Sequence, residues 1–290
     1  MEFYSGKDLL NICEEHKYKI SDLMIKSESL TFSKNEEDII KEMNRSYEVM
    51  KKAIEKSLKE DLKSMGGLIG GEAKTLYSNI KNKKNICGSL VSKAMAYGMG
   101  VLEVNASMGL IVAAPTAGSC GIIPGVFRAL QEEYNLDDEI MVKGLFNAGA
   151  IGMIISRNAT VSGAEGGCQA ETGSAAAMAA SAVCEIMGGS PKQCLDAAAI
   201  SIKNIMGLIC DPIAGLVEAP CQKRNAIGVA NAFISAEMAL AGIDSLIPFD
   251  EVVSAMYKVG KSMPMELRET ALGGVAASET GCNLCSKIFG

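Results

Sequence analysis

The sequence has no tryptophan and one histidine, and aromatic residues occupy only 5% of its 290 positions. Alanine, glycine and methionine dominate the apolar residues, so we expect helices that pack through small side chains rather than through aromatic clusters. The single histidine, His16, lies in the charged segment 13–19. There an exposed helix face is a better interpretation than a catalytic role.

A concentrated positive charge is also missing. The net charge is −6 and Lys and Arg form no cluster, which argues against nucleic acid binding, because phosphate neutralisation needs many basic side chains. The first residues mix acids and bases and lack an apolar signal-peptide core, so we expect a cytoplasmic protein with a small-molecule ligand. With 48% apolar residues, the chain can bury a substantial core.

Neither a membrane span nor a disulfide framework is expected. The longest uncharged run, 104–127, contains Asn105, Pro115, Pro124 and four glycines, which predicts a loop in its interior. Ten cysteines in a chain without a signal peptide indicate core thiols and metal ligands rather than disulfides.

The clearest helix signal lies in the N-terminal quarter. Ser33 followed by Glu36 resembles a capping box, and apolar residues then recur at three- or four-residue intervals over 40–62. The other face is rich in Lys and Glu, so residues 1–65 are interpreted as a charged, solvated helical flank. No repeat or composition break marks a further boundary, which predicts one domain over 1–290.

From about residue 88 the charge becomes sparse, as expected for a buried helical body around a site. Ser190, Pro191 and Gln193 supply an N-cap, a first-turn proline and a capping-box partner for a further helix. Alternating runs of strand length are scarce, which predicts an all-α fold with glycine-rich loops forming the site. The predicted helices of this body span about 88–103, 139–156, 172–187, 190–206, 225–240 and 250–260.

Four glycine-rich segments lack regular helical patterning: 114–124, 163–171, 210–225 and 271–281. Glycine or proline next to a cysteine permits the turns by which a thiolate approaches a metal cluster without a backbone collision. Three cysteines lie in such turns, and four others are interpreted as packing thiols. The three are Cys168, Cys210 and Cys221, and the packing thiols are Cys13, Cys87, Cys184 and Cys194.

The spacing of these three cysteines is weak support for a cluster, because ferredoxin-type motifs place their cysteines only a few residues apart. From the spacing alone, buried cysteines in small-residue turns remain the favoured alternative.

The second and third segments, with Cys168, Cys210 and Cys221 in the same order and context, resemble the signature of the iron-sulfur-dependent L-serine dehydratases. The resemblance is to the separate α chain of the two-subunit type, and it extends through 114–124 and the stretch that begins at Ala271. It covers most of residues 90–281 and is far more specific than a cysteine count.

This resemblance implies a cytoplasmic lyase of amino-acid degradation and gluconeogenesis that converts L-serine to pyruvate and ammonia. It implies a [4Fe-4S] cluster held by Cys168, Cys210 and Cys221, and a β chain that completes the active site of a hetero-oligomer. An iron with three protein ligands keeps an open position for the substrate hydroxyl, which is a poor leaving group and needs an electrophile.

The other route to the same reaction uses pyridoxal phosphate, which needs a Schiff-base lysine and a glycine-rich phosphate loop. The stretch 66–71 is glycine-rich, but a turn after the preceding helix explains it, and no matching lysine motif accompanies it. We therefore expect no pyridoxal phosphate.

The resemblance makes the loop from Thr116 to Cys120 the implied substrate loop. Thr116, Ala117, Gly118, Ser119 and Cys120, with their backbone amides, form a candidate nest for the substrate carboxylate. The alternative is a plain structural turn, and Cys120 is also a candidate to approach the cluster.

Four further polar residues are candidates for the site. Arg224 follows Cys221 by three residues and could pair with a carboxylate, although most arginines lie on the surface. Asn147, Glu165 and Glu171 are polar within apolar stretches and are candidates to orient the substrate. Helix capping or a satisfied buried hydrogen bond is the alternative for each.

The general base is not identified, and a histidine base would have to come from another chain, in agreement with a β subunit. Cys282 and Cys285 form a Cys-x-x-Cys pair that could be redox-active, bind a separate metal, or have no role. In single-chain members of the family a C-terminal cysteine is thought to occupy the fourth iron position. This chain has two tail cysteines, and either is a candidate for that ligand.

Two other functions stay open. Elimination of sulfide from L-cysteine uses the same carbon chemistry, and assays of both amino acids would separate the two lyases. A non-catalytic iron-sulfur or thiol-based sensor protein would bind a cluster without lyase activity.

Overall fold

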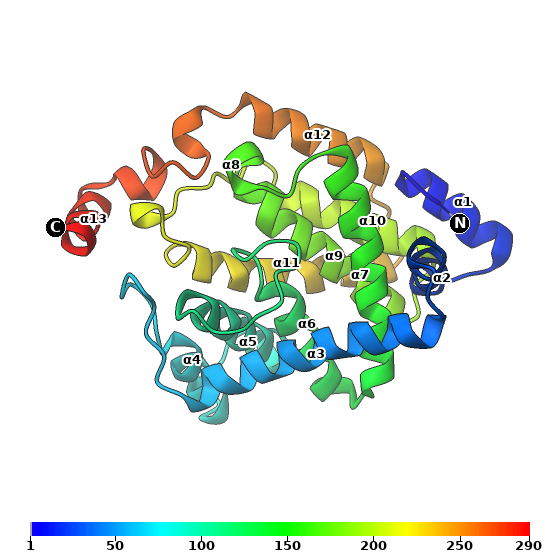
Figure 1. Cartoon of the computed structure of the whole chain (residues 1–290), viewed down its shortest axis with the longest axis horizontal. Helices are drawn as coiled ribbons and strands as arrows, with labels where there is room; N and C mark the ends of the chain where they lie inside the picture. The colour runs from blue at the N-terminus through cyan, green and yellow to red at the C-terminus, as the bar shows by residue number, and fades with distance from the viewer. Residues whose placement is uncertain (1) are drawn as a thin grey trace.

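The computed structural model describes residues 2–290, and these residues form helices and loops without a β-sheet (Figure 1). The all-α prediction is therefore confirmed. The one extended pairing in the described range is an isolated bridge between Cys210 and Arg268. The longer helices are α1 (Gly6–His16), α2 (Ile20–Phe32), α3 (Glu36–Lys59), α4 (Glu72–Lys81), α5 (Gly88–Ala106), α6 (Ile122–Tyr134), α7 (Asp138–Asn158), α9 (Ser174–Ile186), α10 (Pro191–Asn204), α11 (Cys221–Leu240), α12 (Phe249–Ser262) and α13 (Glu279–Phe289). The short turns are α8 (Gly163–Gly166), the π-helical η1 (Gln169–Gly173), and the 3₁₀ turns η2 (Ile213–Gly215), η3 (Met265–Leu267) and η4 (Gly274–Ala277).

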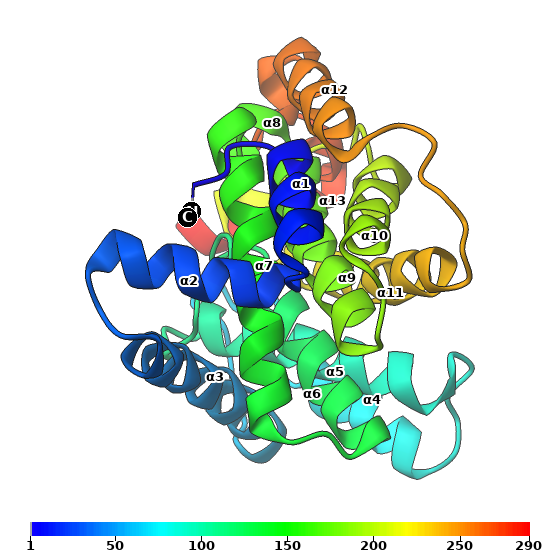
Figure 2. The same cartoon turned by 90° about the vertical axis from the view of Figure 1, so that its right-hand side faces the viewer.

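Helix α9 lies at the centre of the molecule, with α7, α10 and α11 packed around it (Figures 1 and 2). Six of its alanines are 0% exposed. Alanine side chains let neighbouring helices approach closely on all sides, so a dense core forms with few aromatic residues. The expectation of small-residue packing is confirmed at this helix.

Helices α5 and α6 also pack through glycine. A Cβ atom at Gly125 would lie 2.7 Å from the Ala94 carbonyl oxygen, and one at Gly121 would overlap the Gly98 carbonyl oxygen. No side chain can therefore stand at either position without moving the helices apart. This contact fixes the place where the loop before α6 returns to the core.

Most helices predicted from the sequence pattern are confirmed, with ends that differ by a few residues. The capping box at Ser190 is present: the Gln193 backbone N–H donates to the Ser190 hydroxyl, and the Ser190 N–H donates to the Gln193 side chain at 2.9 Å. The predictions at 88–103, 139–156, 190–206, 225–240 and 250–260 correspond to α5, α7, α10, α11 and α12.

Two helix starts differ from the prediction. Helix α3 uses Asn35 as its N-cap, and the Asn35 side chain accepts the Asp38 backbone N–H at 2.8 Å. The capping box predicted at Ser33 was wrong, because Ser33 ends α2 in a left-handed backbone conformation. The run 104–127 is a loop only in its middle, since α6 begins before Pro124 and holds that proline in its first turn, where no intrahelical N–H bond is needed.

The N-terminal flank is less solvated than predicted. Phe3, Leu9, Ile20 and Leu23 are each at most 1% exposed and belong to the same buried core as α9. Figure 2 shows α2 lying across α7, and α1 packs against α2, α10 and α12. The flank therefore covers one side of the core, and the division of the chain into domains stays a prediction.

The predicted packing thiols have two different environments. Cys13, Cys184 and Cys194 are buried, as expected. The interpretation of Cys87 was wrong, because it is exposed at the start of α5, in the connection that follows α4.

Helix α7 is the one described helix with the length and apolar composition of a membrane span. Of its apolar window, 67% is buried inside the protein, where α7 packs against α9 and α2. A central helix of a folded core has the same composition, so this helix is weak support for a membrane span.

Candidate active site

Cys168, Cys210 and Cys221 are all buried, with exposed fractions of 3%, 2% and 6%. Cys168 directly precedes the π-helical turn η1, Cys210 forms the isolated bridge with Arg268, and Cys221 is the first residue of α11. Three separate segments therefore each deliver one thiol to the interior. We refer to these three residues as the cysteine cluster.

The three thiols influence one another's ionisation. Contact with the Cys210 thiol lowers the pKa of Cys168 to about 6, against the effect of burial, and the Thr172 hydroxyl 3.2 Å from its sulfur and Arg224 act in the same direction. The same contact, together with burial, raises the pKa of Cys210. Burial, and then the charge of Cys168, raises the pKa of Cys221 to about 12. The structure thus brings the three predicted ligands into one neighbourhood.

The π-helical turn after Cys168 replaces the start of the helix predicted over 172–187. Gln169 holds this turn: its side-chain amide donates to the carbonyl oxygens of Gly166 and Met256, both at 2.9 Å, and its Oε1 accepts the Gly207 N–H at 2.8 Å. A single π-helical turn within a helix is frequent at functional sites, because it changes the direction of the side chains that follow. Here it sets the direction of Glu171.

Glu171 lies between the substrate loop and the cysteine cluster. A Cβ atom at Gly118 would lie 3.1 Å from its Oε2, and one at Gly163 would lie 2.9 Å from its Oε2 and 3.0 Å from the Cys210 sulfur. Burial, and then the charge of Cys168, raises the pKa of Glu171 to about 7, while a hydrogen bond with Thr116 opposes the rise. The sequence indicated Glu171 as one of several polar candidates but not this position.

Asn225 holds the substrate loop in place. Its side-chain amide donates to the Gly118 carbonyl oxygen at 2.8 Å, and its Oδ1 accepts the Gly121 N–H at 3.0 Å. The Thr116 and Ser119 hydroxyls lie 3.0 Å apart. Asn225, which is 0% exposed, was missed as a site residue. The signal available in the sequence was a polar residue directly after Arg224, at the end of the segment 210–225.

The same loop presents backbone donors. Within residues 2–290, the amides of Ala117, Gly118 and Ser119 donate to no protein acceptor. Consecutive backbone N–H groups of this kind can bind an anion such as a carboxylate. Cys120, by contrast, is 0% exposed and belongs to the apolar core.

Arg224 positions the Cys210 segment. Its Nη2 lies 2.6 Å from Asp211 Oδ1, and its Nη1 donates to the Ile209 carbonyl oxygen at 3.0 Å. Asp211 is 1% exposed, and its other oxygen accepts the Val275 N–H at 2.6 Å. The guanidinium thus has a buried carboxylate partner within the protein and also lies close to Cys168.

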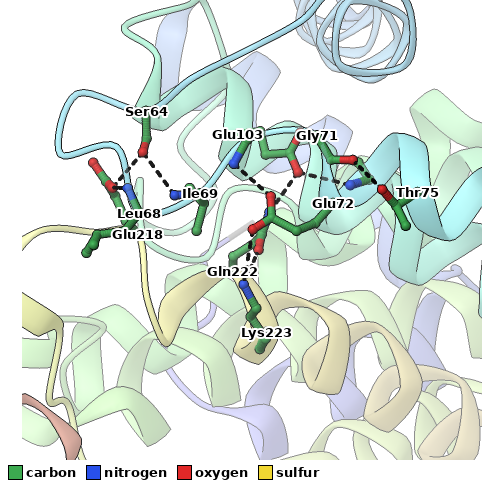
Figure 3. Close-up of polar contacts among 12 residues, drawn as sticks. Ser64, Leu68, Ile69, Gly71, Glu72, Thr75, Glu103, Glu218, Gln222 and Lys223 are labelled. Carbon is green, nitrogen blue, oxygen red and sulfur yellow. Dashed lines mark hydrogen bonds and ion pairs between the residues drawn. The ribbon is translucent and has the colours of Figure 1, made fainter. Parts of the chain in front are cut away.

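Two further polar anchors flank Cys221, and Figure 3 shows them on either side of the start of α11. Glu218 accepts hydrogen bonds from the Ser64 hydroxyl (2.6 Å) and from the N–H groups of Gly66 (2.7 Å) and Leu68 (3.0 Å). The glycine-rich stretch 66–71 is therefore a loop bound to the Cys221 segment. No local sequence pattern links Glu218 to residues this distant.

Gln222, directly after Cys221, forms the second anchor. Its side-chain amide donates to Glu103 at 2.8 Å and to Glu72 at 3.3 Å (Figure 3). Burial is the largest cause that raises the pKa of Glu103, whose Oε2 has no hydrogen-bond partner among the described residues. This network joins α4, α5 and α11 behind the cysteine cluster.

Other sequence candidates lie elsewhere. Asn147 donates to Glu185 at 2.9 Å, near the end of α9 that is remote from Cys168. At 1.5 Å rise per residue, that end lies about 20 Å from the start of the helix, so Asn147 is not part of this site. Glu165 has a side chain 56% exposed, and its carboxylate lies 3.9 Å from the Lys261 ammonium. His16 is exposed and stacks on Tyr18, as expected for a surface helix.

The tail cysteines lie on α13, which packs against η2, in the segment between Cys210 and Cys221 (Figure 1). Cys282 is exposed and Cys285 is partly exposed. Their spacing places both on the same side of the helix.

The donor set suits an iron-sulfur cluster better than a single ion. Within residues 2–290, no three His, Cys, Asp or Glu side chains are placed to hold one metal ion together. The cysteine ligands of a [4Fe-4S] cluster bind different iron atoms, so a common point of coordination is not required. Three buried thiols, with no histidine beside them, match the soft ligands that such clusters prefer.

Comparison with known proteins identifies close sequence relatives. The protein family described as "Serine dehydratase alpha chain" matches residues 15–276. The "Probable L-serine dehydratase, alpha chain" of Bacillus subtilis (strain 168) is 50% identical over 288 residues, which cover 99% of this chain and 96% of that protein. The "L-serine dehydratase, alpha chain" of Peptoniphilus asaccharolyticus is 49% identical over 277 residues, which cover 96% and 95%. The "L-serine dehydratase" of Streptomyces coelicolor is 36% identical over 286 residues, which cover 97% of this chain but 62% of that protein.

Proposed function

Because the chain belongs to the serine dehydratase alpha chain family, we propose that it is the α chain of an L-serine dehydratase, which converts L-serine to pyruvate and ammonia. The observation that carries this proposal is the convergence of three buried cysteines beside a loop with free backbone amides. Neither feature alone indicates a lyase; together, in this family, they supply a cofactor site and a carboxylate site.

Cys168, Cys210 and Cys221 would hold a [4Fe-4S] cluster, which supplies the Lewis acid for departure of the substrate hydroxyl. Elimination removes a proton from Cα and hydroxide from Cβ, which together form water. The aminoacrylate that remains tautomerises to an imine, and water hydrolyses that imine to pyruvate and ammonia. No pyridoxal phosphate is needed in this scheme.

The residues of this chain have defined tasks in the scheme. The amides of Ala117 to Ser119 would bind the substrate carboxylate, with Asn225 fixing their loop. Arg224 would hold the Cys210 segment through Asp211 and favour the ionised thiol of Cys168. A predicted direct contact between Arg224 and the substrate is less well supported, because its guanidinium is already paired.

A β chain would complete the site. The Streptomyces coelicolor protein has a further region outside its match to this chain, which spans 62% of its length. The name "alpha chain" of the two most similar relatives described here implies a companion chain. The general base, for which this chain offers no histidine near the cysteine cluster, would come from that partner. We infer a cytoplasmic hetero-oligomer of amino-acid degradation that feeds gluconeogenesis.

Anaerobic reconstitution tests the proposal. The chain, purified with its partner and loaded with iron and sulfide, should show the visible absorbance of a cluster and form pyruvate from L-serine. Cys210→Ala should lose both the absorbance and the activity, because two protein ligands are too few to hold the cluster. Cys87→Ala, a change at an exposed cysteine, is the matched control and should retain both. A Cys210→Ala protein with full cluster content and activity would refute the assignment.

The same preparation separates the alternatives. Sulfide release from L-cysteine without pyruvate from L-serine would favour a desulfidase. A cluster without lyase activity in the presence of the partner would favour a sensor. Cys282→Ala and Cys285→Ala, each compared with wild type by the cluster's spectrum, test whether either tail cysteine is a fourth ligand.

A further inference from the structure

Glu171 occupies a position that the proposed reaction scheme has not yet used. It lies on η1, three residues after Cys168, and the π-helical turn directs its side chain between Gly118 and Gly163. The residue is partly exposed, although burial is the largest cause that raises the pKa of its carboxyl group.

Two glycines make room for this carboxylate. A methyl group at Gly118 would lie 3.1 and 3.2 Å from its two oxygens, and one at Gly163 would lie 2.9 Å from Oε2. Neither Gly118 nor Gly163 has a left-handed backbone that would by itself favour glycine. Glycine at both positions therefore leaves room for the Glu171 carboxylate, and at Gly163 also for the Cys210 sulfur.

Negative charge is concentrated around Glu171. Burial, the charge of Cys168 and, more weakly, that of Glu269 raise the pKa of Glu171 to about 7, and the hydrogen bond with Thr116 acts against them. Two arginines lie near the cysteine cluster. Arg224 is already paired with Asp211, and Arg268, which forms the isolated bridge with Cys210, has its Nη1 3.5 Å from the Glu165 carbonyl oxygen. A cationic group beside the Glu171 carboxylate would offset its negative charge.

Backbone donors and a carboxylate acceptor lie close together in the substrate loop and η1. The amides of Ala117, Gly118 and Ser119 have no protein acceptor in the described chain, and the Glu171 carboxylate lies directly against Gly118. An α-amino acid carries an ammonium and a carboxylate on one carbon atom, so its two charges need an acceptor and a donor group side by side. This loop and this side chain provide that arrangement.

We propose that Glu171 binds the α-ammonium group of the substrate while the amides of 117–119 bind its carboxylate. The proposal rests on the proposed function, since it assumes that an amino acid occupies this site. It makes Glu171 the residue by which the site selects α-amino acids over hydroxy acids or other carboxylates.

The test compares two ligands that cannot undergo elimination. L-Alanine has the ammonium group and propanoate lacks it, and ligand-observed NMR gives the dissociation constant of each for the reconstituted holoenzyme. Wild type should prefer L-alanine. Glu171→Gln should weaken L-alanine binding about 10- to 100-fold, the effect of losing a charged hydrogen-bond partner, and change propanoate binding less than about threefold.

Matched variants make the result specific. Glu165→Gln removes an exposed glutamate from the same segment and should leave both constants unchanged. Glu171→Asp keeps the charge and should retain part of the preference. Gly118→Ala places a methyl group against the carboxylate and should reduce the preference without removing any charge, which tests the site even if Glu171→Gln fails to fold.

Two results would overturn the proposal. One is an unchanged preference for L-alanine in Glu171→Gln or, if that protein does not fold, in Gly118→Ala. The other is a loss of turnover with unchanged ligand binding, which would make Glu171 a proton-transfer residue instead. Failure of the proposed function would give a different result. The wild-type holoenzyme would then bind L-alanine through Glu171 but form no pyruvate from L-serine.

Discussion

The anchor at Glu218 yields a sharp prediction about how the Cys221 segment is held. Glu218 is 3% exposed, and its two oxygens accept hydrogen bonds from Ser64, Gly66 and Leu68. In Glu218→Gln, one of these oxygens becomes an NH₂ group that must face an N–H or O–H donor. At least one hydrogen bond is lost, and the others no longer involve a charge.

The magnitude follows from these contacts. A hydrogen bond to a charged group contributes about 1.5–3 kcal/mol and a neutral one about 0.5–1.5 kcal/mol. Loss of one charged bond and weakening of two others should lower the free energy of unfolding by about 3 kcal/mol. For a chain of this size we expect Tm to fall by about 6–12 °C.

Two assays check the prediction. Thermal unfolding gives the change in Tm, and brief trypsin digestion reports cleavage after Lys63, which lies exposed just before Ser64 and the bound loop 66–71. Cleavage should be faster in Glu218→Gln, while Glu55→Gln, at an exposed ion pair with Lys59, should behave as wild type. If Glu218→Gln keeps both the wild-type Tm and the wild-type cleavage rate, the carboxylate does not hold this loop.

Three further outcomes are expected. Gly149→Ala, in the middle of α7, adds a methyl group whose nearest neighbour is the Met24 methyl at 4.0 Å, and it should stabilise the protein by about 0.5–1 kcal/mol in urea unfolding. Gly121→Ala should instead destabilise it through overlap with α5. Because burial raises the pKa of Glu103 in the folded protein above its usual value of 4.5, deprotonation opposes folding and stability is lost as pH rises through the folded-state pKa. Glu103→Gln should therefore flatten the dependence of Tm on pH and raise Tm at neutral pH; an unchanged profile would contradict this. A thiol reagent followed by mass spectrometry should modify exposed Cys87 rapidly and buried Cys194 only after unfolding.

The sequence pattern predicted the helices well where local chemistry determines them. The Ser190 capping box and the long apolar repeat of α3 need no information beyond a few neighbouring residues. The start of α3 was misplaced because Ser33 and Asn35 are both acceptable N-caps, and only the preceding helix decides between them. The loop predicted through Pro124 was too long because a proline in the first helical turn gives the same local signal as one in a loop.

The site could be predicted only in part. Cysteines beside glycine and proline, supported by the family resemblance, indicated the three residues that the structure brings together. Pairings between distant residues, such as Glu218 with Ser64, carry no local signal, since each residue alone resembles an ordinary polar residue. Asn147 shows the opposite error: its unusual polarity is explained by Glu185, at the other end of α9.

The order in which the ligand segments are synthesised has a consequence for maturation. Cys168 emerges from the ribosome well before Cys221, and the tie from Asp211 to Val275 can form only when the chain is almost complete. Iron delivered to a nascent chain would meet one or two thiols without the third. If the three cysteines hold the proposed cluster, its loading would therefore be completed after translation, and the yield of active protein should depend on how long the finished apoprotein stays reduced before iron arrives.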